Sequence, residues 1–297
     1  MRIVVAGGSG FLGLPLIRTL RTAGHEVTQL VRRPATKPDQ VTWDPAGPVS
    51  LPEDTAAVIN LCGASIGRRW TDSYRQELLD SRVVPTTTLA KAVAAQGIGL
   101  LINASGVGSY GDTGQTEVTE ESPAFTGTDF LSRISAQWEG ATGYAAKAGA
   151  RVVLLRTGLP LSVQGGFLKP QLLPFRLGVG GKLGDGKQWV PWVSFTDWLR
   201  AVQLALTDEE IDGPLNIVGP NPVTNAQFTK ALGKVLRRPT FMFVPKLAVQ
   251  ALYGEYASEG YRSMRVKPQV LLSQGFRFEH PTVDQALRAA FAQPAAA

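Results

Sequence analysis

The most restrictive feature of this sequence is a set of closely spaced glycines near its start. Gly7, Gly10 and Gly13 directly follow the apolar run 3–6, and an apolar-periodic segment, residues 12–20, comes next. Strand, glycine turn and helix in this order predict a phosphate-binding turn, because glycine allows a tight bend and close approach of a pyrophosphate, and the helix N-terminus attracts anions. We therefore favour nucleotide binding over an ordinary βα turn, with contacts at Gly7, Ser9, Gly10, Phe11, Leu12 and Gly13.

Composition places the chain among ordinary globular proteins. Of its 297 residues 44% are hydrophobic and 18% charged, which suits an α/β domain with a smaller lobe. The net charge of +6 is scattered rather than gathered in a basic stripe with interleaved aromatics, so we do not expect nucleic-acid binding. Arg18 and Arg21 interrupt the apolar start too early for a signal peptide, and no apolar run reaches the roughly 18 residues of a membrane span. We expect no membrane partner and a cytoplasmic location.

Cysteine and histidine are scarce. The single cysteine, Cys62, rules out an intrachain disulfide and lies in an apolar run, so we interpret it as a buried, inert thiol in a reducing compartment. The two histidines, His25 and His280, are far apart in the sequence. We expect no metal site.

Short apolar runs alternate with helical segments through the first half of the chain. This alternation predicts a Rossmann-like, doubly wound parallel sheet of the α/β class, with helices on both faces. Expected strands after the first cover residues 26–31, 41–43, 57–61, 100–104, 150–156 and 215–218. Expected helices cover residues 74–96 (bent near Pro85), 130–148, 197–206 (capped by Asp197) and 224–236 (opened by a capping box of Thr224 and Gln227).

The pattern dissolves into glycine, proline and apolar residues between positions 161 and 187. We interpret this stretch as the excursion into a second lobe that would carry the substrate loop. The predicted dinucleotide-binding domain covers residues 1–165 and is rejoined by 189–218. The smaller, mostly helical substrate and C-terminal lobe covers residues 166–188 and 219–297.

The end of the second strand indicates which nucleotide is bound. Rossmann domains that prefer NAD place a carboxylate there, whereas this strand ends Val31-Arg32-Arg33. A guanidinium forks onto a 2′-phosphate with charge-assisted bonds, so we predict NADP(H), with Arg32 as the better candidate. The alternative is a pair of exposed arginines before Pro34.

Ribose and nicotinamide contacts are expected at the carboxyl ends of later strands. The small residues Gly63 and Ala64 follow the third long strand and would let the backbone approach a cofactor. The expected contacts are Leu61, Cys62, Gly63, Ala64, Ser105 and Leu159.

Together the glycine turn, the strand end 60–64, Ser105 and the segment 155–158 resemble the extended short-chain dehydrogenase/reductases. Further strings narrow the resemblance to the atypical NAD(P)-dependent epimerase family, which carries a short C-terminal domain of unknown function. These strings are Arg69-Trp70-Thr71 with Ser81-Arg82, residues 173–178, residues 184–188, Trp192-Val193 with Asp197, and Gly275-Phe276. The resemblance implies NADP(H) contacts at Val31, Arg32, Leu61 and Cys62, and adds Glu77 and Arg82. Spacing alone would make Glu77 and Arg82 solvent-exposed helix positions.

Dehydrogenases of this superfamily use a serine and a Tyr-x-x-x-Lys pair. The lysine and the cofactor's positive ring lower the tyrosine pKa from its usual value near 10. Aligning Glu139 with the glutamate that often follows the lysine puts Leu131 at the tyrosine position and Ser135 at the lysine position, so the usual acid/base is absent. The family often has a histidine at the position of Ser194, which excludes a histidine acid/base at that place in the chain.

Other residues near the expected hydride position are Ser105 and Tyr110, the two catalytic candidates. Tyr110 is equally compatible with a second interpretation, in which it is a packed aromatic of the loop whose hydroxyl is hydrogen-bonded within the protein. Tyr144 and Lys147 are only three positions apart, and we expect them to be a surface pair rather than a replacement for the catalytic pair. The tryptophans at 189, 192 and 198 could line a site for a flat ligand, but we expect them to pack in the core.

Two functions are compatible with these residues. The first is an NADP(H)-dependent oxidoreductase or epimerase-like enzyme acting on an unknown small-molecule substrate. The second is a weakly active or inactive NADP(H)-binding sensor or regulator. By analogy with the family the protein is a monomer or homodimer.

Overall fold

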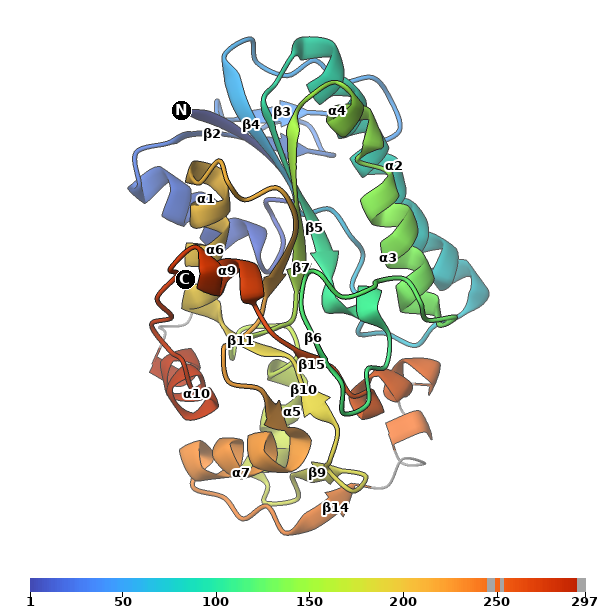
Figure 1. Cartoon of the computed structure of the whole chain (residues 1–297), viewed down its shortest axis with the longest axis vertical. Coiled ribbons are helices and arrows are strands. Elements are labelled where there is room, and N and C mark those ends of the chain that lie inside the picture. Colours follow the sequence, from blue (N-terminus) through green and yellow to red (C-terminus); the bar gives the residue numbers. More distant parts are fainter. Residues whose placement is uncertain (245–248, 252–253, 293–297) are drawn as a thin grey trace.

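A seven-stranded parallel sheet forms the centre of the computed structural model, which describes residues 1–244, 249–251 and 254–292. The strand order is β3-β2-β1-β4-β5-β7-β12, so the order reverses between β1 and β4 (Figure 1). Such a reversal creates the crevice in which open α/β sheets bind ligands. The strands are β1 Arg2–Ala6, β2 Glu26–Val31, β3 Gln40–Thr42, β4 Thr55–Asn60, β5 Leu100–Gly106, β7 Arg151–Thr157 and β12 Gly213–Ile217.

Alternating side chains of the strands build one apolar layer on each face of the sheet. Ile3 and Val5 of β1 pack with α1 (Gly13–Thr22) and α6 (Phe195–Thr207). Val4 and Ala6 face the other way, toward α2 (Asp72–Gln96) and α4 (Gly143–Lys147), with α3 (Phe130–Gly140) on the same side (Figure 1). Because both faces are covered, the middles of the central strands β1, β4, β5 and β7 are runs of apolar residues, as in most parallel sheets. The predicted Rossmann-like fold is confirmed.

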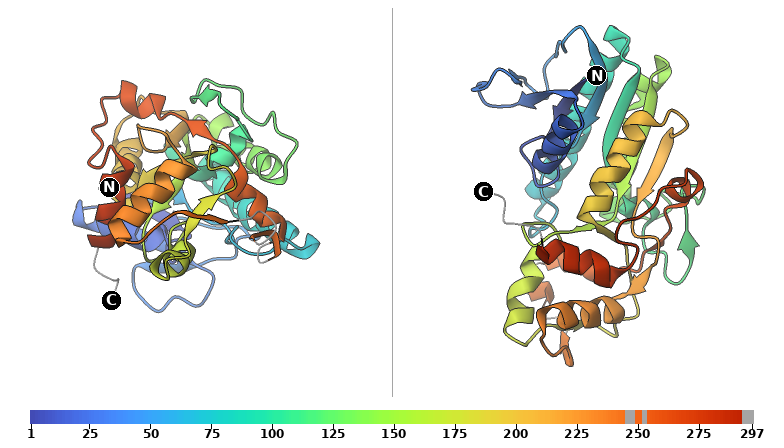
Figure 2. Two further views of the ribbon diagram at one scale, coloured as in Figure 1. Left: turned by 90° about the horizontal axis from the view of Figure 1, so that it is seen from below. Right: turned by 90° about the vertical axis from the view of Figure 1, so that its left-hand side faces the viewer.

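The carboxyl ends of the strands point toward a second lobe, which lies below the sheet in Figure 1 and under α6 in the right view of Figure 2. Its core joins α5 (Lys169–Arg176), α7 (Asn225–Leu236) and α10 (Val283–Ala292) through Phe175, Phe228 and Leu287. The remaining short elements are β6 Glu117–Val118, β8 Leu159–Leu161, β9 Gly181–Leu183, β10 Trp189–Val190, β11 Trp192–Ser194, β13 Val223–Thr224, β14 Met242–Val244, β15 Arg265–Val266, η1 Val107–Tyr110, η2 Gly254–Tyr261 and α9 Gln269–Ser273.

Most expected elements are present, with strand ends shifted by about two residues at most. The capping box of Thr224 and Gln227 is confirmed at the start of α7. One long helix over 130–148 is wrong, because α3 ends at Gly140 and α4 begins at Gly143. Two glycines and a back-bond from the Thr142 hydroxyl to the Glu139 carbonyl, at 2.7 Å, interrupt the helix there.

The expected cap of α6 is also wrong. Ser194 is the N-cap and accepts a hydrogen bond from the Asp197 amide, so Asp197 lies inside the first turn. The buried Asp197 carboxylate instead accepts hydrogen bonds from the amides of Glu279 and His280, at 2.7 and 3.0 Å. This side chain therefore fastens the segment before α10 to the sheet domain.

Candidate functional site

The glycine turn after β1 has the geometry of a phosphate-binding turn. Gly7 has a φ of +75°, and a Cβ there would lie 2.6 Å from the Leu61 backbone. A Cβ at Gly13 would lie 2.4 Å from the Gly7 carbonyl oxygen. At Gly10, which is exposed, only that same oxygen comes near, at 3.3 Å. The fold itself thus requires glycine at positions 7 and 13. At Gly10 the absence of a side chain instead leaves the main chain accessible from solvent.

The N-terminus of α1 is open to an anion. Its N-cap, Leu12, offers no side-chain hydrogen bond, and no acidic residue occupies the first turn. Ser9 is exposed beside it, and the Phe11 ring packs on Phe195 with centroids 5.2 Å apart. The positive end of the helix dipole therefore has no counter-charge of its own from the capping position or first turn.

The two arginines after β2 have different surroundings. The Arg33 guanidinium donates to the Pro34 carbonyl at 3.2 Å and to the Thr36 hydroxyl at 3.0 Å, within its own loop. Arg32 is exposed and forms no hydrogen bond or ion pair with the residues that the structure describes, while Val31 before it is buried. Arg32 is the free cation at this strand end.

Cys62, after β4, is half-buried rather than fully buried as expected, and it lies within electrostatic reach of Arg32. Burial raises the pKa of its thiol to about 12, and the Arg32 charge acts in the opposite direction. The thiol is therefore protonated and unreactive at neutral pH. β2 and β4 flank β1 on its two sides and run parallel to it, so the carboxyl ends of the three strands lie at the same end of the sheet.

Arg82 of α2 supports the loop after β4 from below. Its guanidinium donates to the carbonyls of Ala64 and Leu78, at 3.0 and 2.9 Å, and lies over the Trp138 ring at 5.0 Å. Desolvation lowers its pKa to about 10, against an opposing effect of the Tyr74 phenol, and Arg82 forms no ion pair with a carboxylate of the described residues. A Cβ on the exposed Gly63 would lie 3.2 Å from the guanidinium carbon, so Arg82 lies just beneath that surface.

The remaining expected cofactor contacts lie in different surroundings. Glu77 is exposed on α2, whereas Arg82 is buried, so the structure separates these two residues onto different faces of the helix. Leu159 is half-buried at the start of β8 and packs against the core of the second lobe. Leu61 donates its amide to the Ala6 carbonyl at 2.9 Å, which continues the β1–β4 ladder past Asn60.

A buried polar network joins the two catalytic candidates. The Ser105 hydroxyl donates to Glu139 Oε1 at 2.6 Å, and Arg156 binds both oxygens of the same carboxylate at 3.0 and 2.9 Å. The Tyr110 hydroxyl accepts from Arg156 Nη1 at 3.0 Å and donates to Asn216 Oδ1 at 2.9 Å. Burial raises the pKa of Tyr110, and the Arg156 charge opposes that shift. Both hydroxyls are committed to protein partners.

Sequence reasoning did not identify Arg156 and Asn216 as members of this network. A charged residue near the end of an otherwise apolar strand, followed by Thr157 and Gly158, is the signal that points to Arg156. Glu139 served only as an alignment marker, although a glutamate on the buried face of α3 requires a cationic partner.

Leu131 and Ser135 lie on α3 on the side of η1 and the sheet. Leu131 is half-buried, and a Cβ on Gly108 would lie 3.5 Å from its Cβ. Tyr144 is exposed and carries Lys91 over its ring at 5.0 Å. Of the three tryptophans, Trp192 and Trp198 are buried in the core, and Trp189 is half-buried and donates to Gln115 at 2.9 Å.

A histidine does reach Ser194, contrary to the expectation from its position in the chain. The Ser194 hydroxyl and His280 Nδ1 are 2.8 Å apart, and His280 comes from the segment before α10. Residue 194 is therefore not a histidine, as expected, but a histidine from another part of the chain lies next to it. Among the described residues, no three His, Cys, Asp or Glu side chains are placed to hold a metal ion.

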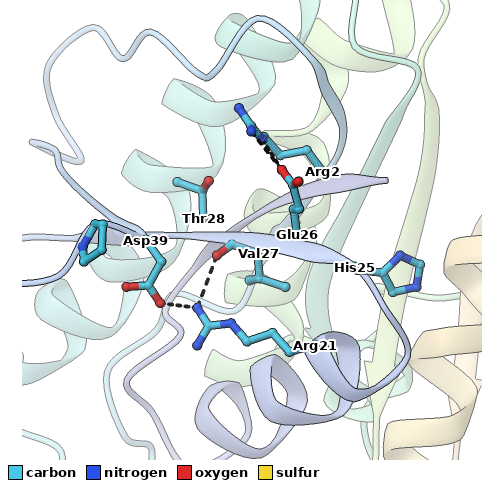
Figure 3. A pocket seen from close by; sticks show the side chains of 8 residues that line it. Arg2, Arg21, His25, Glu26, Val27, Thr28 and Asp39 are labelled. Atoms are coloured by element: carbon cyan, nitrogen blue, oxygen red, sulfur yellow. Dashed lines mark hydrogen bonds and ion pairs between the residues drawn. The ribbon is translucent and has the colours of Figure 1, made fainter.

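A hollow of about 420 Å³ lies at the opposite end of the strands, where β1 and β2 begin. Figure 3 shows the side chains that line it. Arg21 pairs with Asp39, and Arg2 pairs with Glu26 at 2.8 Å. Burial and the N-terminal ammonium lower the pKa of His25 nearby. Because both arginines are paired and none of the expected site residues lines this hollow, we do not assign the chemistry to it. In the described ranges no helix is both long and apolar enough to cross a membrane.

Comparisons with known proteins agree with this geometry. The model of the NAD dependent epimerase/dehydratase family matches residues 3–218, and a domain of unknown function (DUF1731) matches residues 244–290. Epimerase family protein Mb2239 of Mycobacterium bovis is 43% identical over 297 residues, with 98% of each chain covered. These findings confirm the resemblance inferred from the sequence.

Two solved structures extend the comparison. The crystal structure of human epimerase family protein SDR39U1 (isoform 2) with NADPH has a TM-score of 0.92 and 35% identity, and the match covers 99% of this chain and 100% of that one. A nucleoside-diphosphate sugar epimerase from Corynebacterium glutamicum has a TM-score of 0.79 and 36% identity, and the match covers 97% of this chain and 57% of that one.

Proposed function

This chain belongs to the NAD dependent epimerase/dehydratase family, and we propose that it binds NADP(H) across the carboxyl ends of β1, β2 and β4. The pyrophosphate would lie on the bare main chain at Gly10, against the open N-terminus of α1. The ribose and nicotinamide would continue along the loop 61–64, above Arg82. That a human relative at 35% identity was crystallised with NADPH supports this assignment.

The free guanidinium of Arg32 is the observation that carries the choice of cofactor. It is exposed at the end of β2 and unpaired within the described residues, and its charge acts on Cys62 at the end of β4. An adenosine ribose between these two strand ends would bring its 2′-phosphate to this cation. A carboxylate at the same place would repel that phosphate.

Titration of the protein with NADPH and NADH in a calorimeter tests this proposal. A charge-assisted contact to the 2′-phosphate is worth about 1.5–3 kcal/mol, so NADPH is expected to bind at least about tenfold more tightly than NADH. Equal affinities, or no heat with either nucleotide, would contradict it.

We also propose that the protein is an oxidoreductase rather than an epimerase that relies on a Tyr-x-x-x-Lys pair. Bound NADP(H) supplies or accepts a hydride at its nicotinamide. Leu131 carries no exchangeable proton, while Ser105 is committed to Glu139 and Tyr110 to Arg156 and Asn216. We assign positioning roles to Ser105 and Tyr110. They hold the side chains of Glu139 and Arg156 in place and thereby fix α3 against β5 and β7.

The second candidate is an NADP(H)-binding sensor without turnover. The leucine at the position of the usual tyrosine favours it, because a protein that only binds cofactor needs no proton donor there. NADPH binding with no oxidation of NADPH across a panel of electron acceptors would support the sensor.

A further inference from the structure

An aromatic cluster lies beside the position of the absent tyrosine. Trp70 contacts Phe130 edge to face, with ring centroids 5.2 Å apart, and the ring of Tyr256 lies 5.9 Å from Trp70. Leu131 packs in the same group, together with Ala64 and Ile66 of the loop after β4. We call Trp70, Phe130, Leu131 and Tyr256 the aromatic cluster. The aromatic cluster connects the loop after β4 with α3 and η2.

The aromatic cluster offers an apolar wall and not a polar pocket. Trp70 is buried at 8% exposure and supports Phe130, Leu131 and Tyr256, which are half-buried. Since Leu131 adjoins Gly108 of η1, just past Ser105, the wall borders the place where a hydride acceptor would lie. A flat, apolar molecule fits such a surface because rings stack on it without leaving polar groups unpaired.

Arginines surround this wall. The Arg75 guanidinium lies over the Phe130 ring at 4.9 Å, and Arg68 lies over the Tyr74 ring at 5.8 Å. Arg75 pairs with Glu255, whereas Arg68 and the neighbouring Arg69 are exposed and form no ion pair with the described residues. The carboxylates beside the wall, Glu255, Asp129 and Glu259, are paired with Arg75 and Arg262. Arg68 and Arg69 are therefore cations without a paired carboxylate among the described residues, and they would stabilise an anion that forms on the wall.

The acceptor must tolerate the lack of a protein acid at residue 131. Reduction of an ordinary aldehyde or ketone produces an alkoxide, which is about as basic as hydroxide, so its conjugate acid is far weaker than a phenol. Reduction of a quinone produces a delocalised phenolate, about as basic as tyrosinate, whose conjugate acid has a pKa of about 10. Water can protonate the second anion after the hydride has moved, whereas the first needs a proton during transfer.

We propose that the substrate is a quinone lying on the aromatic cluster, an inference that rests on the NADP(H) binding proposed above. The quinone takes up the hydride, two electrons and one hydrogen, as a C–H bond of the reduced cofactor breaks and an O–H bond forms on the quinone. Its other oxygen becomes negatively charged beside the arginine rim and takes a proton from water. NADPH, quinone and one water molecule are thereby converted to NADP⁺, hydroquinone and hydroxide.

The first test compares 1,4-naphthoquinone with 2-naphthaldehyde, which has the same ring size but a simple carbonyl. General acid catalysis contributes about 10²-fold or more, so kcat/KM with NADPH is expected to be at least about 100-fold higher for the quinone. Comparable values for the two would overturn the inference. A tenfold or greater loss of quinone turnover in Tyr256→Phe, which removes only the hydroxyl, would reveal a protein proton donor and overturn the solvent step.

The second test measures binding without turnover. 1,4-Naphthoquinone is titrated into NADP⁺-loaded protein in a calorimeter, and Phe130→Ala or Tyr256→Leu is expected to weaken binding about five- to tenfold. The control is Phe241→Ala, a ring that is 81% exposed beside β14 in the second lobe. Equal affinity in the cluster variants and the control would overturn the inference. A parallel NADPH titration separates the two proposals, because NADPH binding without naphthoquinone binding or turnover contradicts only the quinone.

Discussion

Arg156 grips both oxygens of the Glu139 carboxylate, with Nε 3.0 Å from Oε1 and Nη2 2.9 Å from Oε2, and neither side chain is more than 7% exposed. The pair joins β7 to α3 and recruits Ser105 of β5 and Tyr110 of η1. Burying two charges is costly, and the four hydrogen bonds offset much of that cost. The pair therefore specifies how α3 is placed against the sheet.

Glu139→Gln is expected to lower the free energy of unfolding by about 3–5 kcal/mol, because it leaves the Arg156 charge buried without a counter-charge. Urea unfolding followed by circular dichroism measures this loss. Glu77→Gln is the matched control, since Glu77 is exposed on α2 and its replacement is expected to change stability by less than about 0.5 kcal/mol. Similar urea midpoints for the two variants would show that the pair contributes little.

Tyr110→Phe tests the positioning role of the tyrosine. Removing the hydroxyl takes one partner from Arg156 and one from Asn216, so we expect a loss of about 1–2 kcal/mol in unfolding free energy. The NADPH dissociation constant should stay close to that of the unmodified protein. Unchanged stability together with abolished turnover would assign Tyr110 to catalysis instead.

Gly10 and Gly13 have different roles in the glycine turn. In Gly10→Ala the new methyl group would occupy the bare surface proposed for the pyrophosphate, so we expect NADPH affinity to fall about tenfold or more, with little change in stability. In Gly13→Ala the methyl group would collide with the Gly7 carbonyl, at 2.4 Å, and stability itself should fall. Calorimetry and thermal unfolding of both variants check this contrast, which fails if the two variants behave alike.

Glu259 makes stability depend on pH. Burial raises its pKa from 4.5 to about 7, with further raising by Asp129, Glu255 and Asp112 and an opposing effect of Arg262. Since the folded state binds the proton more tightly than the unfolded state, this contribution to stability is full below pH 4.5 and is lost as the pH rises to about 7. Glu259→Gln should remove this loss, on the order of 2 kcal/mol, from unfolding measured at pH 5 and pH 8. An unchanged difference between the two pH values would contradict the shift.

Local sequence patterns predicted the helices, strands and turns. They could not predict side-chain contacts between residues that are far apart in the sequence. The glycine turn and the capping box of Thr224 and Gln227 are each encoded within a few residues, so the sequence identified both. The role of Asp197 depends on amides 82 and 83 positions away, and His280 reaches Ser194 across 86. No periodicity reports such contacts. The same holds for Tyr110 and Asn216, whose hydrogen bond spans 106 positions.

The most direct test of the central claim repeats the calorimetric titrations with Arg32→Ala and Arg33→Ala. Arg33 is the control because its guanidinium is already bound within its own loop. The account predicts that Arg32→Ala weakens NADPH at least about tenfold and leaves NADH nearly unchanged, while Arg33→Ala changes both little. An equal loss for the two nucleotides in Arg32→Ala, or a loss confined to Arg33→Ala, would contradict it.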